Sequence, residues 1–203
     1  MAATWQENWL PDTNPIAALR LVTPAAPIVT WGEAAAFLRI DGTTEQTLVE
    51  SFIAAATQHL DAKYGILAGT ALGIQTWEMY LDAFPCGPIK IPLSPFVDVA
   101  SITYFDGEGL QQTMDPASYE IDNKSYDGWV VPLGSWPATL AAINVVTVRF
   151  RAGFGTIPAP LKAAVLLLTG HIYEHREAVS ANALTEIPIG VDRLVAPYRR
   201  IHV

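Results

Sequence analysis

The spacing of apolar residues changes its period twice along this chain, and this limits the folds open to it. Within residues 48–60 and again within 161–172, apolar residues recur every three or four positions, as on the buried face of a helix. Between those stretches, short runs of β-branched and aromatic residues are separated by Asp-Gly and Asp-Pro pairs, which favour tight turns between antiparallel strands. The pattern predicts an α+β fold: a small helical body with an inserted antiparallel β subdomain.

Turn signals and proline positions set the boundaries of this organisation. Residues 1–29 are predicted to form an extended N-terminal arm, because four prolines interrupt any periodicity there. Residues 30–72 and 153–203 are expected to form the helical body, with three to four helices and a C-terminal tail. Residues 73–152 would form the β insertion. A chain of 203 residues is long enough for one such unit.

Three helix starts are marked in the sequence. A hydroxyl residue followed three positions later by Glu or Gln satisfies backbone N–H groups that a helix start leaves without partners. Proline is also well tolerated at the first helical positions. The second helix is expected to run to about Tyr64 and to end at Gly65. The predicted starts are Thr30 with Glu33, Thr43 with Gln46, and Pro158 with Pro160.

Composition narrows the classes of function. A formal net charge of −8 argues against a nucleic-acid-binding surface. Charged residues make up 16% of the chain, below the roughly 25% that is usual, which favours a protein that covers part of its surface in an assembly. Cys86 is the single cysteine, so no intrachain disulfide is expected. With no signal-peptide pattern and no apolar run of membrane-spanning length, a cytosolic setting without membrane contact is expected.

His171, Glu174 and His175 match the H-x-x-E-H pattern of inverted zinc peptidases. Two histidines four residues apart on a helix can bind one metal, with the glutamate as general base. Such a site also needs a third ligand and an open cleft. On the other interpretation these are polar residues of a last helical turn, where cationic histidine suits the helix dipole. We expect no catalytic residue, no cofactor and no metal, and keep a zinc-dependent hydrolase as an alternative.

Two tryptophans, Trp5 and Trp9, lie in the predicted arm. Aromatic residues are enriched at interface centres, so these two are candidates for an arm interface with a neighbouring subunit. Packing onto the chain's own core agrees equally well with their burial preferences. Six acidic residues of the β region fit turn chemistry, or else a negative surface that faces DNA or a partner. They are Asp106, Glu108, Asp115, Glu120, Asp122 and Asp127.

Nine short segments carry a family likeness through their order and spacing. They are LVTP at 21–24, VTWGE at 29–33, FLRID at 37–41, QTW at 75–77, LDAFP at 81–85, ITY at 102–104, VRFRAG at 148–153, PAPLK at 158–162 and HIYEHRE at 171–177. Together they resemble the head-tail connector (adaptor, head-completion) family of bacteriophages and gene transfer agents. The likeness covers about residues 20–200. In such proteins the last of these stretches closes the third helix and has no known metal role.

The resemblance implies a non-enzymatic structural subunit of the virion neck, assembled in the host cytoplasm. Twelve copies would form a ring that joins the portal protein to the stopper or tail-terminator protein and encloses the DNA exit channel. DNA would pass through without specific binding, because an acidic lumen repels it.

The basic C-terminal tail is then the predicted portal-docking element. Tyr198, Arg199, Arg200 and Ile201 would insert against the portal, with the arginines pairing with carboxylates. A further alternative is a tail or host-recognition module that acts through its β region. A protein that stays monomeric in the presence of portal would favour that alternative.

Overall fold

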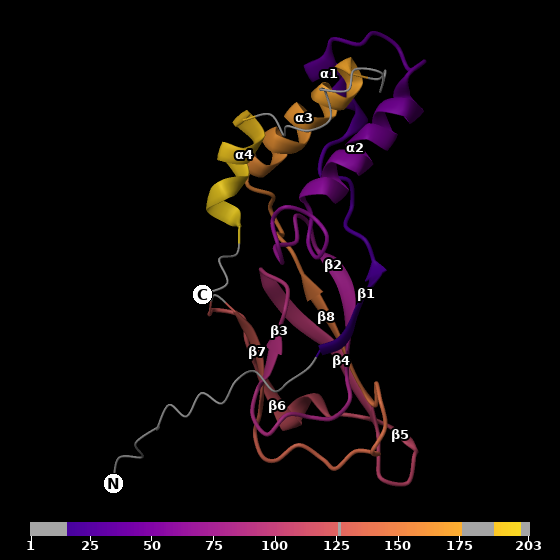
Figure 1. Cartoon of the computed structure of the whole chain (residues 1–203), viewed down its shortest axis with the longest axis vertical. Helices are drawn as coiled ribbons and strands as arrows, with labels where there is room; N and C mark the ends of the chain where they lie inside the picture. Colours follow the sequence, from indigo (N-terminus) through magenta and orange to yellow (C-terminus); the bar gives the residue numbers. More distant parts are fainter. Residues whose placement is uncertain (1–15, 126, 176–188, 200–203) are drawn as a thin grey trace, which may run out of the picture.

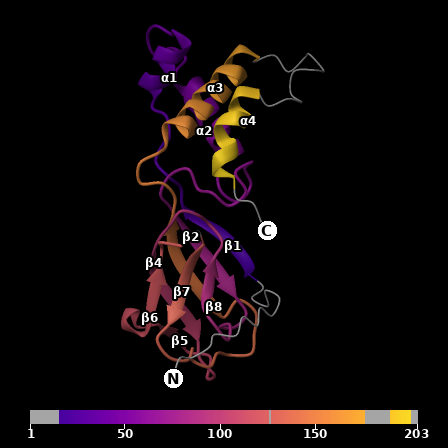
Figure 2. The ribbon, with the colours of Figure 1, turned by 90° about the vertical axis from the view of Figure 1, so that its left-hand side faces the viewer.

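The computed structural model describes residues 16–125, 127–175 and 189–199. The molecule is elongated, with its helices at one end and its strands at the other (Figures 1 and 2). Over the residues that the structure describes, four helices and two antiparallel sheets confirm the predicted α+β class. In the described ranges, no helix has the length and apolar character that crossing a bilayer requires.

The helical body is built around α3. This helix packs against α2 on one side and α4 on the other, with α1 over one end. The most enclosed side chains include Leu60, Leu161 and Val165, each fully buried. The elements are α1 (Trp31–Leu38), α2 (Gln46–Leu60), α3 (Ala159–Glu174), α4 (Ile189–Val195) and the 3-10 turn η2 (Ala196–Tyr198).

The capping box predicted at Thr30 and Glu33 is confirmed, and the one predicted at Thr43 and Gln46 is wrong. At α1, Thr30 Oγ1 accepts from the Glu33 N–H at 3.4 Å, and a Glu33 carboxylate oxygen accepts from the Thr30 N–H at 2.9 Å. At α2, however, Gln46 is the first helical residue and no side chain caps the helix. The Gln46 amide instead donates to Glu50 at 2.8 Å, one turn further along. A bond within the helix has replaced the predicted reciprocal cap.

Helix α2 ends at Leu60, four residues before the expected Tyr64. Asp61 leaves the helix with an extended ψ of 143°, and its carboxylate accepts from the Leu72 N–H at 2.7 Å. The chain then turns back at Gly65, so that the Ile66 and Leu67 N–H groups donate to the last carbonyls of the helix at 3.0 and 3.2 Å. Contacts between residues seven to eleven positions apart therefore set the end of α2.

The β subdomain is a sandwich of two antiparallel sheets. Inward-facing side chains of both sheets form its core, among them Met79, Phe150, Ile89 and Val130, all fully buried. The larger sheet has the order β1 (Ile16–Thr23), β2 (Gln75–Leu81), β8 (Val146–Ala152), β4 (Phe96–Phe105) and β5 (Gln111–Thr113). The smaller sheet has the order β3 (Ile89–Ile91), β7 (Gly128–Pro132) and β6 (Tyr119–Asp122). The 3-10 turn η1 (Pro116–Ser118) directly precedes β6 in the chain.

Strand β1 differs from the arm predicted over residues 1–29. Residues 16–23 do not extend away from the chain but pair antiparallel with β2, with Ile16 opposite Leu81 and Arg20 opposite Glu78. Leu19 packs against the sandwich core, which explains why this stretch joins its own sheet. Residues 1–15 lie outside the described residues.

Two glycines lie together where the helical body meets the β subdomain. Gly153, which follows β8, has a φ of +128°, and a Cβ placed on it would lie 1.9 Å from the carbonyl oxygen of Gly73. Its N–H donates to the Pro95 carbonyl at 2.8 Å. The backbones before β2 and after β8 thus approach more closely than any side chain allows.

Candidate interaction sites

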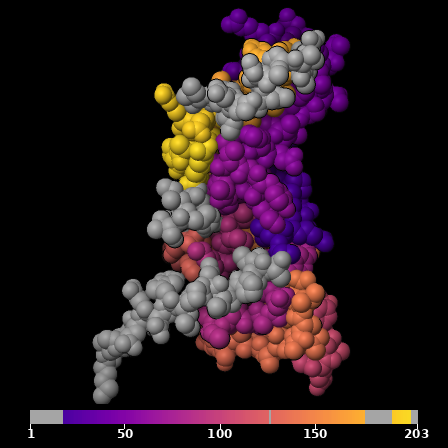
Figure 3. Space-filling view, in the orientation of Figure 1, coloured from indigo at the N-terminus to yellow at the C-terminus, as the bar shows by residue number. Residues whose placement is uncertain are grey.

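A groove of about 1180 Å³ lies between α2 and the segment that runs from β1 to α1. In the space-filling view, the indigo surface of that segment lies against the purple surface of α2 (Figure 3). The groove is lined by residues 19–21, 24–27 and 29–31, by Glu50, Ile53, Ala54, Thr57 and Gln58 of α2, by residues 61–64, and by Gln75 and Trp77 of β2. Most of these side chains are apolar.

A buried chain of hydrogen bonds fixes the floor of the groove. The Trp77 indole N–H donates to the Gln75 amide oxygen at 3.2 Å, and the Gln75 amide donates to the Asp61 carboxylate at 2.5 Å. The same carboxylate accepts from the Leu72 N–H. Burial raises the pKa of Asp61, although these hydrogen bonds oppose the shift. Because each polar group has a partner, the floor is preformed.

Exposed side chains form the rim. Tyr64 is 79% exposed and Leu21 is 42% exposed. The Lys63 ammonium lies 3.3 Å from the Leu19 carbonyl and 5.2 Å from the centre of the Tyr64 ring. The groove therefore combines apolar walls with a cation on the β1 side.

The predicted portal-docking residues are only partly within the described chain. Tyr198 packs edge-on against Phe154, with ring centres 6.1 Å apart, and its carbonyl accepts from the Thr70 hydroxyl at 2.9 Å. Arg199 Nη2 lies 2.6 Å from Asp192 Oδ1 of α4. Both residues are thus held on the chain's own helical body. Arg200 and Ile201 lie outside the described residues.

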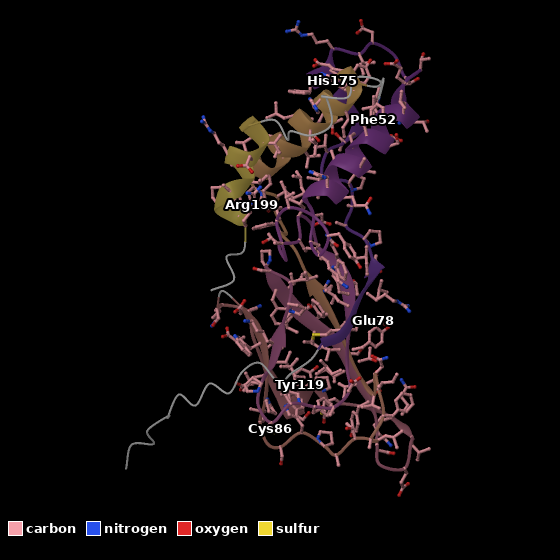
Figure 4. The ribbon with its side chains drawn as sticks, viewed as in Figure 1. Phe52, Glu78, Cys86, Tyr119, His175 and Arg199 are labelled. Atoms are coloured by element: carbon pink, nitrogen blue, oxygen red, sulfur yellow. The ribbon has the colours of Figure 1, made fainter. Side chains whose placement is uncertain are left out.

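The position of this segment was not expected from the sequence. Helix α4 and η2 run toward the β subdomain, so that Arg199 lies beside the junction of the two parts, on the side away from β1 (Figures 1, 2 and 4). Val191 and Val195 are fully buried in the helical core. The described part of the predicted tail, residues 189–199, is therefore packed on the helical body as α4 and η2. Its last described residue, Arg199, lies near the middle of the molecule (Figure 4).

The H-x-x-E-H residues lie on the last turn of α3, at the far end of the helical body (Figure 4). The His171 and His175 rings are 4.4 Å apart, and His175 Nδ1 lies 2.9 Å from the His171 carbonyl oxygen. Glu174 is exposed. Within the described ranges, no three His, Cys, Asp or Glu side chains are grouped so that they could hold a metal ion. The structure brings the two histidines together without a third ligand from the described part.

Three of the six acidic residues of the β region, Asp106, Asp115 and Asp122, accept backbone hydrogen bonds within turns, whereas Asp127 forms an ion pair with Lys90. The Asp106 carboxylate accepts from the Gln112 amide at 2.7 Å and from the Glu108 and Leu110 N–H groups at 3.0 Å, and these bonds lower its pKa. Asp122 likewise accepts from the Ser125 hydroxyl and the Lys124 N–H, and its pKa is lowered. These two carboxylates are charged at neutral pH. Asp106 follows the end of β4 in the turn to β5, whereas Asp122 ends β6, whose next residue, Asn123, donates to the Val97 carbonyl near the start of β4.

Trp5 and Trp9 fall among the residues that the structure does not describe. The arm interface therefore stays a prediction. Sequence reasoning did not find the groove, because its two walls come from segments that only the tertiary fold brings together.

These features define a class of protein: an α+β protein with a helical body, a β sandwich and a preformed surface groove. No family model matches the chain, and no curated protein matches it. Solved structures do. A chain in the neck of an empty gene transfer agent particle, computed with C6 symmetry, matches with a TM-score of 0.71 at 22% identity, over 92% of this chain and 97% of that chain.

Two further structures agree. The virion of a native gene transfer agent particle contains a match with a TM-score of 0.71 and 22% identity, covering 91% of this chain and 96% of that chain. The neck of a native particle, computed with C12 symmetry, gives 0.65 and 22%, covering 92% and 97%. The chain therefore shares its fold with a protein found in gene transfer agent necks, and the fold expected from the sequence resemblance is confirmed.

Proposed function

We propose that this protein is a structural head-tail connector (adaptor) subunit of a virion neck. The observation that carries the proposal is the match in fold to a chain of the gene transfer agent neck, over 97% of that chain's length. The match also covers 92% of this chain, so it concerns nearly the whole subunit and not one common motif.

The subunit forms a ring of twelve copies between the portal protein and the stopper or tail-terminator protein, and the ring encloses the DNA exit channel. The symmetry of twelve is supported by a neck structure computed with C12 symmetry that holds a chain of this fold. A net charge of −8 per subunit, with ionised carboxylates at Asp106 and Asp122 of the β subdomain, supports a lumen that lets DNA pass without specific binding.

The C-terminal residues dock on the portal. Tyr198 and Arg199 fix the base of the docking segment to the helical body, and Arg200 and Ile201 make the direct contact. Arginine suits this role because its planar guanidinium pairs with a carboxylate through two parallel hydrogen bonds.

Electron microscopy of the purified protein mixed with the portal of the same particle tests the ring. The expected result is a twelve-membered ring stacked coaxially on the portal. A protein that remains monomeric at saturating portal, as judged by mass photometry, would contradict the proposal and favour a tail or host-recognition module.

Deletion of residues 200–203 tests the docking segment separately. Co-purification with portal should be lost while the thermal midpoint stays unchanged, because the contacts of Tyr198 and Arg199 remain. The matched control is Arg193→Ala, which removes an exposed positive charge from α4 and should keep portal binding. Equal portal binding by the deletion and the control would refute the docking role.

A further inference from the structure

We propose that the groove between α2 and β1 receives the N-terminal arm, residues 1–15, of the neighbouring subunit, with Trp5 and Trp9 as its apolar anchors. The inference rests on the proposed ring, since it requires a second copy placed beside the first. The proposal assigns the arm a binding site, the groove of the neighbouring subunit, which the fold by itself does not identify.

The groove is built to receive a peptide segment. At about 1180 Å³ it exceeds the roughly 300–1,000 Å³ of a small-molecule pocket. Its floor is rigid, because Trp77, Gln75 and Asp61 hold one another by hydrogen bonds. An occupant would also cover Leu21 and Tyr64, two large side chains that the isolated subunit leaves in water.

The arm has the chemistry that this groove would bind. Residues 1–15 contain two tryptophans and a leucine, which supply large apolar anchors. They contain Glu7 and Asp12 but no lysine or arginine. The β1 side of the groove presents the exposed Lys63 and also Arg20, whose side chain lies 3.8 Å from the Glu78 carboxylate but stays 68% exposed. Glu50 lies on the α2 side, where the Gln46 amide donates to it. An acidic arm therefore meets positive charge along one wall.

The direction of β1 favours a neighbour's arm over the subunit's own. Thr23 pairs near the start of β2, beside the helical body, whereas Ile16 pairs with Leu81 at the other end of β2. The arm thus joins β1 at the end remote from α2. To reach its own groove it would have to reverse at Ile16 and run back along a strand about 26 Å long. Fifteen residues can span up to about 50 Å, which is ample to reach an adjacent subunit.

Crosslinking in mixed rings tests the inference directly. In a Cys86→Ser background, one protein carries Asn8→Cys and a second carries Ala54→Cys, and the two are mixed and assembled on portal under mild oxidation. The expected product is a disulfide-linked dimer between the two proteins. Ala55→Cys is the matched control, because Ala55 is also exposed on α2 but lies outside the groove lining, and it should crosslink much less.

The other outcomes separate this inference from the proposed function. A single protein carrying both Asn8→Cys and Ala54→Cys should give a ladder of linked subunits in the ring. Rings that form normally but yield only an intrachain disulfide, or none, would overturn the arm exchange while leaving the connector function intact. Failure to form any ring on portal would overturn the connector function and this inference with it.

A matched pair of charge substitutions gives a second readout. Ala54→Glu places a carboxylate in the apolar groove against an acidic arm, and ring formation on portal should weaken at least about tenfold. Ala55→Glu adds the same charge one residue away and should change ring formation less than about twofold. The double substitution Trp5→Ala, Trp9→Ala should weaken ring formation about as much as Ala54→Glu does. Combining all three substitutions should weaken ring formation little further, because they remove the same contact. Equal effects of Ala54→Glu and Ala55→Glu would contradict the groove as the site.

Discussion

The Lys162 ammonium, in the first turn of α3, contacts a carboxylate oxygen of Glu33, in the first turn of α1. The other oxygen of the same carboxylate accepts from the Thr30 N–H at 2.9 Å. One side chain therefore caps α1 and also ties it to the start of α3. These bonds, the one from Lys162 first, lower the pKa of Glu33 to about 2.

This pKa predicts a pH dependence that belongs to Glu33. The folded-state pKa lies below the ordinary value of 4.5, so the stabilising effect is fully present above pH 4.5 and is lost as the pH falls toward about 2. Glu33→Gln should lower the thermal midpoint at pH 7, and the difference from wild type should shrink between pH 4.5 and 2. A difference that stays constant over that range would rule out the assignment.

Gly153 should tolerate no side chain. Gly153→Ala forces a Cβ to within 1.9 Å of the Gly73 carbonyl oxygen at a φ of +128°, so the free energy of unfolding should fall by at least about 3 kcal/mol. Gly155→Ala is the control, because the nearest atom to its Cβ is Ile74 Cδ1 at 3.9 Å, and it should change stability by less than about 0.5 kcal/mol. Chemical denaturation of the two variants makes the comparison, and similar losses in both would contradict the close approach.

Two arginines of β8, Arg149 and Arg151, should differ in how much each contributes to the free energy of unfolding. Arg149 contacts Glu78, whose side chain is 8% exposed, while Arg151 contacts Asp98, whose side chain is 32% exposed. The Tyr80 hydroxyl and Arg149 lower the pKa of Glu78, which lies on the outer face of the larger sheet (Figure 4). Arg149→Met should cost about 1–2 kcal/mol, and Arg151→Met less than about 1 kcal/mol, since exposed pairs contribute little. Urea unfolding would show whether this order holds.

Zinc should not bind stoichiometrically at the end of α3. Catalytic zinc takes three protein ligands, and in the described ranges only His171 and His175 are brought together there. Metal analysis of protein purified without chelator should show well under one zinc per chain, and His171→Ala should leave ring formation unchanged. One zinc per chain, lost in that variant, would revive the hydrolase alternative.

Local signals predicted the elements whose boundaries depend on local chemistry. The Thr30–Glu33 box sets the start of α1 through hydrogen bonds within three residues, and proline favours the start of α3 through its fixed φ and missing N–H. The alternation of β8, buried at Val146, Val148 and Phe150, follows from the two faces of a sheet. Such features need no knowledge of the rest of the chain.

Elements that depend on distant partners were missed. Strand β1 exists because β2 offers it an edge, and α2 ends early because Asp61 bonds to Leu72. Helix α4 was hidden by Pro188, Gly190 and Pro197, although Val191 and Val195 already stand four residues apart, the spacing of a buried helical face. The groove needs β1 and α2 side by side, and no pattern in either segment contains that information.

The meeting of Gly73 and Gly153 has a mechanical consequence. The chain crosses between the helical body and the β sandwich at residues 24–30, 61–74 and 153–158, and the latter two crossings pass each other with no room for a side chain. Bending that moves these two crossings toward each other would have to push together two backbones that are already in contact. A force that acts on the helical body should therefore be transmitted to the β sandwich, and the two parts should move as one rigid body.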